Sequence, residues 1–264
     1  VKKVNENILD DFKGELHSIP QIDVRYLGIN VESRPELRIK KVRKAICHAV
    51  DRKTVLESSN KVTSALAEGI LPPGIMGHFA SNIYDYNPEK SVQLLKESGL
   101  RDGIKVPLVY FFSDSEIENK KAVVIKEFLE AVNIRVELRP LAWSDFIDAC
   151  KEKEVQLFSL GWIADNEDPD NFFYPLFHSR NIGISGNYFN YRNDRVDELL
   201  DRAMSMLSKE GRIGVYNQVE KIIVEDAPAL FMSHSLNYSM TSSSFRGFKP
   251  HPLDYYNIED WWKF

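Results

Sequence analysis

The chain has 264 residues, of which 43% are hydrophobic and 28% are charged, a balance typical of folded domains rather than disordered segments. Its 34 basic and 39 acidic residues give a net charge of -5 without a basic block, so a nucleic-acid-binding surface is not indicated. No uncharged stretch is long enough to cross a bilayer. Cys47 and Cys150 have no CxxC or histidine pattern beside them, so neither a zinc site nor a redox pair is indicated, and their disulfide state stays open.

The first part of the chain predicts a short strand and two helices. The strand covers residues 24–31 and is ended by Arg34-Pro35. A helix begins near residue 38 and ends near residue 51 or continues to 56, because its apolar residues share one stripe: Ile39, Val42, Ile46 and Ala49. Residues 67–78 are rich in proline and glycine and form a loop. A second helix begins at Asn87-Pro88-Glu89, with asparagine as the cap and proline in the first turn.

The segment 105–160 has the most regular pattern. Strands and helices alternate there over residues 105–112, 117–132, 134–139, 144–151 and 155–160. Repeated βαβ units imply a helix-covered sheet, so we expect the three strands to be parallel neighbours in a three-layer α/β fold. Ligands of such sheets bind beyond the carboxyl ends of the strands, and Gly161 to Asp165 follow the last strand directly.

Two amphipathic helices, an extended segment and an aromatic tail complete the chain. The helices cover residues 194–207 and 212–224, and Asp226-Ala227-Pro228 ends the second. The extended segment covers residues 230–240. The tail from residue 245 to 264 carries several large aromatic side chains, namely Tyr255, Tyr256, Trp261 and Trp262. Such a concentration of aromatic residues indicates a surface that packs on something else.

The stretch from residue 160 to 177 places four acidic residues around Pro169, between a strand end and an aromatic run. A carboxylate at the edge of an aromatic-lined cleft is suited to bind a cation, because poor solvation strengthens its ion pairs. The simpler interpretation is a solvated acidic turn closed by an aromatic anchor. A calcium loop does not fit, because its sixth position is Asp170 where glycine is required, and its twelfth is not glutamate.

The sequence carries no dinucleotide-binding, Walker, serine-hydrolase or zincin motif. Two carboxylates of the acidic turn, residues 165–170, are the alternative basis for a hydrolase such as a glycosidase. Nothing in the sequence separates their pKa values, so this alternative has little support. Ser233-His234-Ser235 is an isolated group on an expected strand and is interpreted as structural.

Several motifs occur in a fixed order across most of the chain. They are Tyr26-Leu27-Gly28-Ile29-Asn30, Val42-Arg43-Lys44-Ala45-Ile46 with Ala49-Val50-Asp51-Arg52, Leu71-Pro72-Pro73-Gly74, Tyr86-Asn87-Pro88-Glu89, Gly161-Trp162 through Asp165 to Asp168-Pro169-Asp170-Asn171-Phe172, and Glu225-Asp226-Ala227-Pro228. In this order they resemble the solute-binding proteins of ABC importers, in the dipeptide and oligopeptide family (extracellular solute-binding protein family 5). The stretch from Gly161 to Phe172 is the most specific of them.

The resemblance implies a two-lobed receptor that is periplasmic or extracellular and membrane-associated, with a lipid anchor as one option. Such a receptor closes on a solute and delivers it to a membrane permease. It implies a lobe II over residues 28–231, a remnant of lobe I with the hinge strand over residues 1–27, and a hinge return with the end of lobe I over residues 232–264. The rest of lobe I and the export signal are expected outside this sequence. A monomer without cofactor, metal or catalytic residue is expected.

The resemblance also implies ligand-binding residues. The aspartate at the position of Asp165 pairs with the α-ammonium of a peptide ligand, and Trp162 lines the cleft; Gly161 and Ala164 complete the expected site. The dipeptide branch holds the ligand carboxylate with an arginine after the strand that corresponds to residues 105–112. Here Ser113-Asp114-Ser115-Glu116 has no basic residue, so oligopeptides are favoured over dipeptides. Nickel chelates and oligosaccharides are the alternative ligands within the family.

Overall fold

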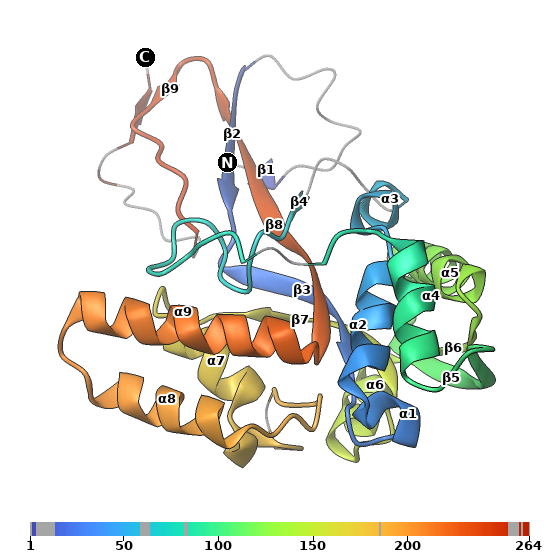
Figure 1. Ribbon diagram of the computed structural model, residues 1–264. Helices are drawn as coiled ribbons and strands as arrows, with labels where there is room; N and C mark the ends of the chain where they lie inside the picture. The colour runs from blue at the N-terminus through green and yellow to red at the C-terminus, as the bar shows by residue number, and fades with distance from the viewer. Residues whose placement is uncertain are drawn as a thin grey trace.

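The computed structural model describes residues 2–3, 14–58, 64–81, 84–184, 186–252, 259 and 261–263 (Figure 1). Their strands form one mixed eight-stranded sheet in the order β1-β8-β3-β7-β5-β6, with β2 and β4 also pairing with β8, and a separate pair, β9 and β10. The strands are β1 (Lys2–Lys3), β2 (Gly14–Pro20), β3 (Asp23–Ile29), β4 (Ser64–Leu66), β5 (Ile104–Ser113), β6 (Ile134–Leu141), β7 (Leu157–Ile163), β8 (Ala229–Ser242), β9 (Phe245–Arg246) and β10 (Trp262–Lys263).

The helices cover the sheet and pack on each other around it. They are α1 (Pro35–Arg38), α2 (Lys40–Ala49), α3 (Arg52–Glu57), α4 (Pro88–Glu97), α5 (Glu116–Ala131), α6 (Trp143–Lys151), α7 (Asp170–Phe177), the short 3-10 helix η2 (Ser179–Asn181), α8 (Asp194–Ser205) and α9 (Lys209–Asp226). Among the described helices, none combines the length and the apolar character that a membrane span requires.

The parallel part of the sheet has the arrangement predicted from the alternating segment. Strand β5 pairs in parallel with β6 on one side and with β7 on the other. Helix α5 connects β5 to β6 at the edge of the sheet, and α6 connects β6 back past β5 to β7, so the two connections run in opposite directions across the strands. Because such crossovers are almost always right-handed, α5 and α6 cover opposite faces of the sheet. The expected helix-covered α/β fold is confirmed.

The rest of the sheet is antiparallel and is built around strand β3. This strand pairs with β7 from Asp23 opposite Ile163 to Ile29 opposite Leu157, and with the beginning of β8 on its other edge. Gly28 lies directly opposite Phe158, and a Cβ atom at Gly28 would lie 2.3 Å from Cζ of that ring. A glycine is therefore required here for the strands to pair without displacing the aromatic core.

Helix boundaries differ from the sequence prediction where a side chain caps a helix. Of the two alternatives for the helix after residue 38, the structure shows the one that ends near residue 51: α2 ends at Ala49, and the separate helix α3 begins because the Asp51 carboxylate accepts a hydrogen bond from the Lys53 amide. Helix α9 begins at Lys209, three residues earlier than predicted, because the Ser208 hydroxyl accepts the Gly211 amide. Local caps of this kind override an apolar stripe at helix ends.

The core of the domain is aromatic. Phe189 lies at its centre, with ring centroids 5.1 Å from Tyr26, 5.5 Å from Phe158 and 5.5 Å from Phe177. The aromatic run that follows the acidic turn forms α7 and is buried there. It therefore serves to anchor the turn to the body of the domain. Both cysteines are free and buried in the same core.

The C-terminal aromatic tail is described only in part. Phe245 and Phe248 each contact the Trp261 ring, and Phe248 also contacts His17 near β2. Tyr255 and Tyr256 lie outside the described residues. In Figure 1 this part of the chain lies beside β2 and the end of β8, away from the helices that cover the lower part of the sheet.

A buried glutamate on α9 holds the proline- and glycine-rich loop. Glu220 has no solvent exposure, and its Oε1 atom accepts a hydrogen bond of 2.7 Å from the Ile70 amide. Burial raises the pKa of the Glu220 carboxyl from its ordinary value of 4.5 to about 7, and the donors at Ile70 and Ser81 offset only part of that effect. The folded state therefore holds this proton more tightly than the unfolded chain.

We expect this group to make the chain less stable as pH rises. Its contribution to the free energy of unfolding is fully present below pH 4.5 and is lost as pH rises through about 7, with a total loss of up to about 3 kcal/mol. Denaturant unfolding of Glu220→Gln, whose amide keeps an acceptor for Ile70, should show a flatter pH dependence and higher stability at alkaline pH. The exposed Glu127 on α5 provides the control Glu127→Gln. Equal pH slopes for the wild type and Glu220→Gln would contradict the assignment.

Candidate ligand-binding site

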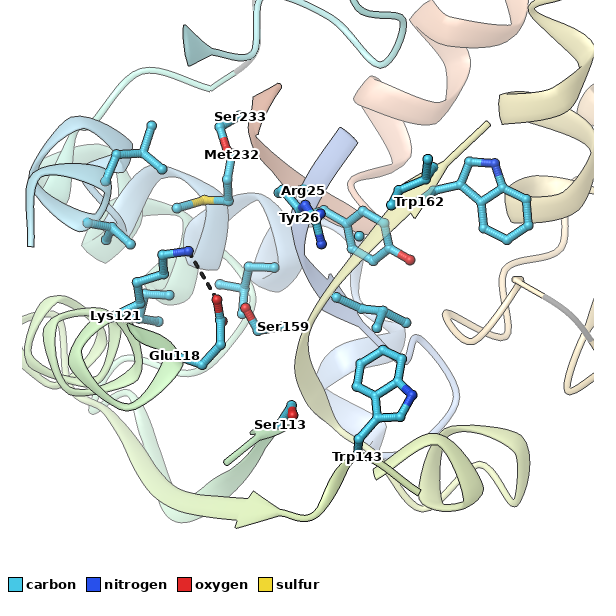
Figure 2. Close-up of a pocket in the computed structure, with 17 residues that line it drawn as sticks. Arg25, Tyr26, Ser113, Glu118, Lys121, Trp143, Ser159, Trp162, Met232 and Ser233 are labelled. Carbon is cyan, nitrogen blue, oxygen red and sulfur yellow. Dashed lines mark hydrogen bonds and ion pairs between the residues drawn. The ribbon is translucent and has the colours of Figure 1, made fainter. Parts of the chain in front are cut away.

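A cavity of about 420 Å³ lies beside the carboxyl ends of β5 and β7, a size typical of small-molecule sites. Figure 2 shows Ser113 from the end of β5 on one side of it and Met232 and Ser233 from β8 on the other. Lys121 and Glu118 enter it from α5. The cavity therefore occupies the position at which open parallel sheets bind their ligands.

Gly161 lines this cavity because the strand register places it opposite Arg25. Directly paired residues of antiparallel strands point to the same face of the sheet, so the Arg25 side chain extends across Gly161. A Cβ atom at Gly161 would lie 2.5 Å from Cδ and 2.8 Å from Nη1 of Arg25. The glycine thus leaves the space in which the arginine lies.

Trp162 also lines the cavity, but its indole is directed to the other face of β7. Its Nε1 atom donates a hydrogen bond of 2.6 Å to the carbonyl of Asn171 at the beginning of α7. Figure 2 shows the indole on the far side of β7 from Lys121 and Glu118. The tryptophan therefore joins the cavity wall to the acidic turn.

Asp165 lies just beyond the end of β7 and is exposed. Its amide donates to Oδ1 of Asn171 at 2.9 Å, which holds the backbone of the turn. Within the described part of the chain, no group donates a hydrogen bond to its carboxylate or forms an ion pair with it. Ala164 beside it is buried, and its amide donates to the carbonyl of Ile22. Neither residue is among those that line the cavity.

The other carboxylates of the acidic turn have structural partners. Both oxygens of Asp168 accept hydrogen bonds from Arg212 on α9, at 2.7 and 2.8 Å. Burial alone would raise the pKa of Asp168, but the donors at Arg212 and the Asp170 amide outweigh it and hold this pKa below its ordinary value. Burial and the neighbouring Asp168 charge raise the pKa of Asp170, which accepts from the Tyr216 hydroxyl. Asp168 is therefore not a free carboxylate base for hydrolysis, because Arg212 occupies both of its oxygens.

The Ser233-His234-Ser235 group lies on β8 and holds the beginning of strand β3 through hydrogen bonds to Asp23. The Ser235 amide and hydroxyl donate to the Asp23 carboxylate at 2.7 and 2.6 Å. Nδ1 of His234 donates to the Asp23 carbonyl at 2.7 Å. Burial lowers the pKa of the His234 imidazole. The structural interpretation of this group agrees with these contacts. No cluster of three or more potential metal-ligating side chains occurs among the described residues.

Several cavity residues were not identified in the sequence. Arg25, Lys121, Glu118 and Trp143 all line the cavity, and the Trp143 side chain is 59% exposed at its edge. Arg25 carried a signal, because it is a charged residue inside an otherwise apolar strand and is the one exposed position of β3. The three others lie in the first two turns of the helices that follow β5 and β6, where the sequence pattern does not indicate which way a polar or exposed side chain points.

Known proteins resemble this chain over most of its length. Residues 2–183 match the family model for the middle part of the bacterial extracellular solute-binding proteins, family 5. The heme-binding protein A of Haemophilus influenzae is 32% identical over 249 residues, which cover 93% of this chain and 45% of that protein. The dipeptide-binding protein of Escherichia coli is 28% identical over 250 residues, which cover 93% of this chain and 46% of that protein.

The structure of HbpA2 from Haemophilus parasuis superposes with a TM-score of 0.90 at 25% identity, over 97% of this chain and 51% of that one. This chain thus spans about half the length of the proteins it matches. The resemblance derived from the sequence motifs is confirmed, since the family model covers more than half of the chain. The chain belongs to the bacterial extracellular solute-binding proteins of family 5.

Proposed function

We propose that this chain forms the ligand-binding lobe of an ABC-importer receptor that captures a peptide and delivers it to a membrane permease. The observation that carries the proposal is the free Asp165 carboxylate beyond the end of β7, near a cavity that Gly161 and Trp162 line. A carboxylate that no protein group neutralises is available for a ligand ammonium. Several of the relatives are named for dipeptides, for di- and tripeptides or for oligopeptides, and a peptide presents the ammonium that Asp165 would accept.

The proposal assigns residues 28–231 to lobe II and residues 1–27 and 232–264 to the hinge and part of lobe I. Strand β8 supports this division, because its first residues pair with β3 whereas the residues from Leu236 onward pair with β2. The change of partner falls close to residue 232. The receptor would act as a monomer on the periplasmic or extracellular side, associated with the membrane through its permease or a lipid anchor.

Oligopeptides remain the preferred ligands. The segment 113–116, where a dipeptide receptor would hold the ligand carboxylate, caps α5 through Ser115 and holds Asn119 through Asp114. It presents no cation. The name of another relative refers to heme, and nickel chelates or oligosaccharides are the further alternatives within the family. The acceptor at Asp165 favours a ligand with an ammonium group over these.

We expect this chain by itself to bind peptides weakly. A cleft between two lobes loses half of its contacts and its exclusion of water when only one lobe is present. Isothermal titration calorimetry with mixed peptides should therefore show little heat. Binding with a micromolar or lower dissociation constant would contradict the two-lobed arrangement.

We expect Asp165→Asn to weaken peptide binding in the complete receptor by about a factor of 30 or more. Removing one partner of a partly desolvated ion pair typically costs roughly 2–5 kcal/mol, and each 1.4 kcal/mol corresponds to about a tenfold change in affinity. Folding should change little, because the side chain is exposed. Titration calorimetry of wild type and variant with the same free-amine peptides measures the effect.

Two controls separate this role from a general effect of charge. Glu167→Gln removes an exposed carboxylate from the same turn and should leave the affinity unchanged. Peptides with acetylated amino termini should bind the wild type poorly and lose little more on Asp165→Asn. If folded Asp165→Asn binds free-amine peptides with unchanged affinity, the assignment of Asp165 is wrong and the acidic turn is a solvated loop.

A further inference from the structure

The charges that line the cavity are unevenly neutralised. Lys121 and Glu118 form an ion pair of 3.0 Å within α5, so their charges largely cancel. Arg25 is the remaining charged residue of the lining. The buried Asp23 beside it balances the charge of Arg25 through Nε alone, so what distinguishes Arg25 is the set of N–H donors that this pair leaves unused, and these lie on a strand and not on a flexible loop.

The Arg25 side chain is only partly engaged by the protein. Its Nε atom donates to Oδ2 of Asp23 at 3.1 Å. Asp23 is fully buried and also accepts from the amide and the hydroxyl of Ser235. Within the described residues, neither Nη1 nor Nη2 of Arg25 has an acceptor. The terminal N–H groups are thus available to a ligand, and 46% of the side chain is accessible to solvent.

The position of the guanidinium is set from two sides. Asp23 holds Nε, and the backbone of Gly161 lies under Cδ and Nη1, where any larger residue would displace them. Apolar side chains line the same cavity, among them Leu27, Ile163 and Met232. A preorganised guanidinium in such surroundings binds planar anions strongly, because little side-chain entropy is lost and water competes less.

We propose that Arg25 is the anion-recognition residue of this site and binds a ligand carboxylate through its terminal N–H groups. The inference rests on the proposed function and adds a specificity element on β3 to the ammonium acceptor at Asp165. Two parallel N–H donors match the two oxygens of a carboxylate, whereas Lys121 presents a point charge already paired with Glu118. The carboxylate is the carboxyl terminus of a peptide or an acidic side chain, and the experiment distinguishes these sources.

The experiment measures binding of three oligopeptide libraries, each with lengths from about three to six residues, to the complete receptor by equilibrium dialysis and mass spectrometry. The first library has free carboxyl termini, the second is amidated, and the third is amidated with a glutamate in every peptide. For the wild type we expect amidation to weaken binding about ten- to a hundredfold, the range for charge-assisted hydrogen bonds. Recovery of binding by the third library assigns the contact to an acidic side chain, and no recovery assigns it to the carboxyl terminus.

The protein variants test whether Arg25 causes this preference. Arg25→Gln should bind the free-acid and amidated libraries equally. Arg25→Lys should retain only part of the preference, because lysine keeps the positive charge near Asp23 but lacks the two parallel N–H donors of the guanidinium. Arg139→Gln is the matched control, since Arg139 lies on β6 beside Glu137, outside the cavity. It should retain the full preference. Circular dichroism establishes that each variant is folded, and the comparison of libraries on the wild type does not depend on any variant.

The outcomes separate the two proposals. A wild type that binds no library overturns the proposed peptide-binding function and this inference with it. A wild type that binds all three libraries equally retains the function and overturns the role of Arg25. Folded Arg25→Gln that still prefers a carboxylate overturns it as well.

Discussion

The antiparallel pairing of strand β3 with β7 and with β8 is the constraint on which the candidate site depends. It sets Arg25 opposite Gly161 and brings Ser235 behind Asp23. Because successive residues of a strand point to opposite faces, a shift of one residue in this register would turn the Arg25 side chain into the aromatic core and the Tyr26 ring out of it. Gly28 against Phe158 opposes such a shift, since a Cβ at that position would overlap the ring.

The buried Asp23 carboxylate also links β3 and β8 through charge and hydrogen bonds. A carboxylate without solvent exposure is strongly destabilising unless hydrogen bonds and an opposite charge compensate it. Here the two donors of Ser235 and Nε of Arg25 provide that compensation, and His234 satisfies the carbonyl of the same residue. The histidine and the serines, which read as an isolated catalytic-like group in the sequence, therefore stabilise the strand that carries the cavity charge.

Local patterns predicted the parallel half of the fold well. The strands and helices between residues 104 and 163 each carry their own periodicity, and short crossovers leave few alternatives for their pairing. The antiparallel half depends on contacts between distant parts of the chain, such as Asp23 with Ser235, 212 residues apart. No local pattern encodes such a contact, and the position of Arg25 in the cavity was missed for this reason.

In the acidic turn, too, the sequence pattern does not predict which single residues form contacts with distant parts of the chain. Its four carboxylates are equivalent in sequence, yet Arg212, 44 residues from Asp168, binds that carboxylate through both oxygens. The Asp165 carboxylate, by contrast, has no hydrogen-bond or ion-pair partner among the residues that the structure describes. The sequence pattern pointed to this stretch, and the family resemblance selected Asp165 within it as the expected ammonium acceptor. Which carboxylates are structural follows only from the packing of α9 against the turn.

In the proposed two-lobed receptor, closure would give these partly exposed charges their effect on binding. Two unit charges about 4 Å apart attract by about 1 kcal/mol in water but by about 4 kcal/mol at the lower effective dielectric of a protein surface. Asp165 is exposed and Arg25 is about half exposed in this chain, so each alone would hold a ligand only weakly. A second lobe that covers the cavity removes water from both contacts at once and strengthens both. Recognition of the ammonium and of the carboxylate would thus be coupled to closure, and a solute that lacks either charge would stabilise the closed receptor less.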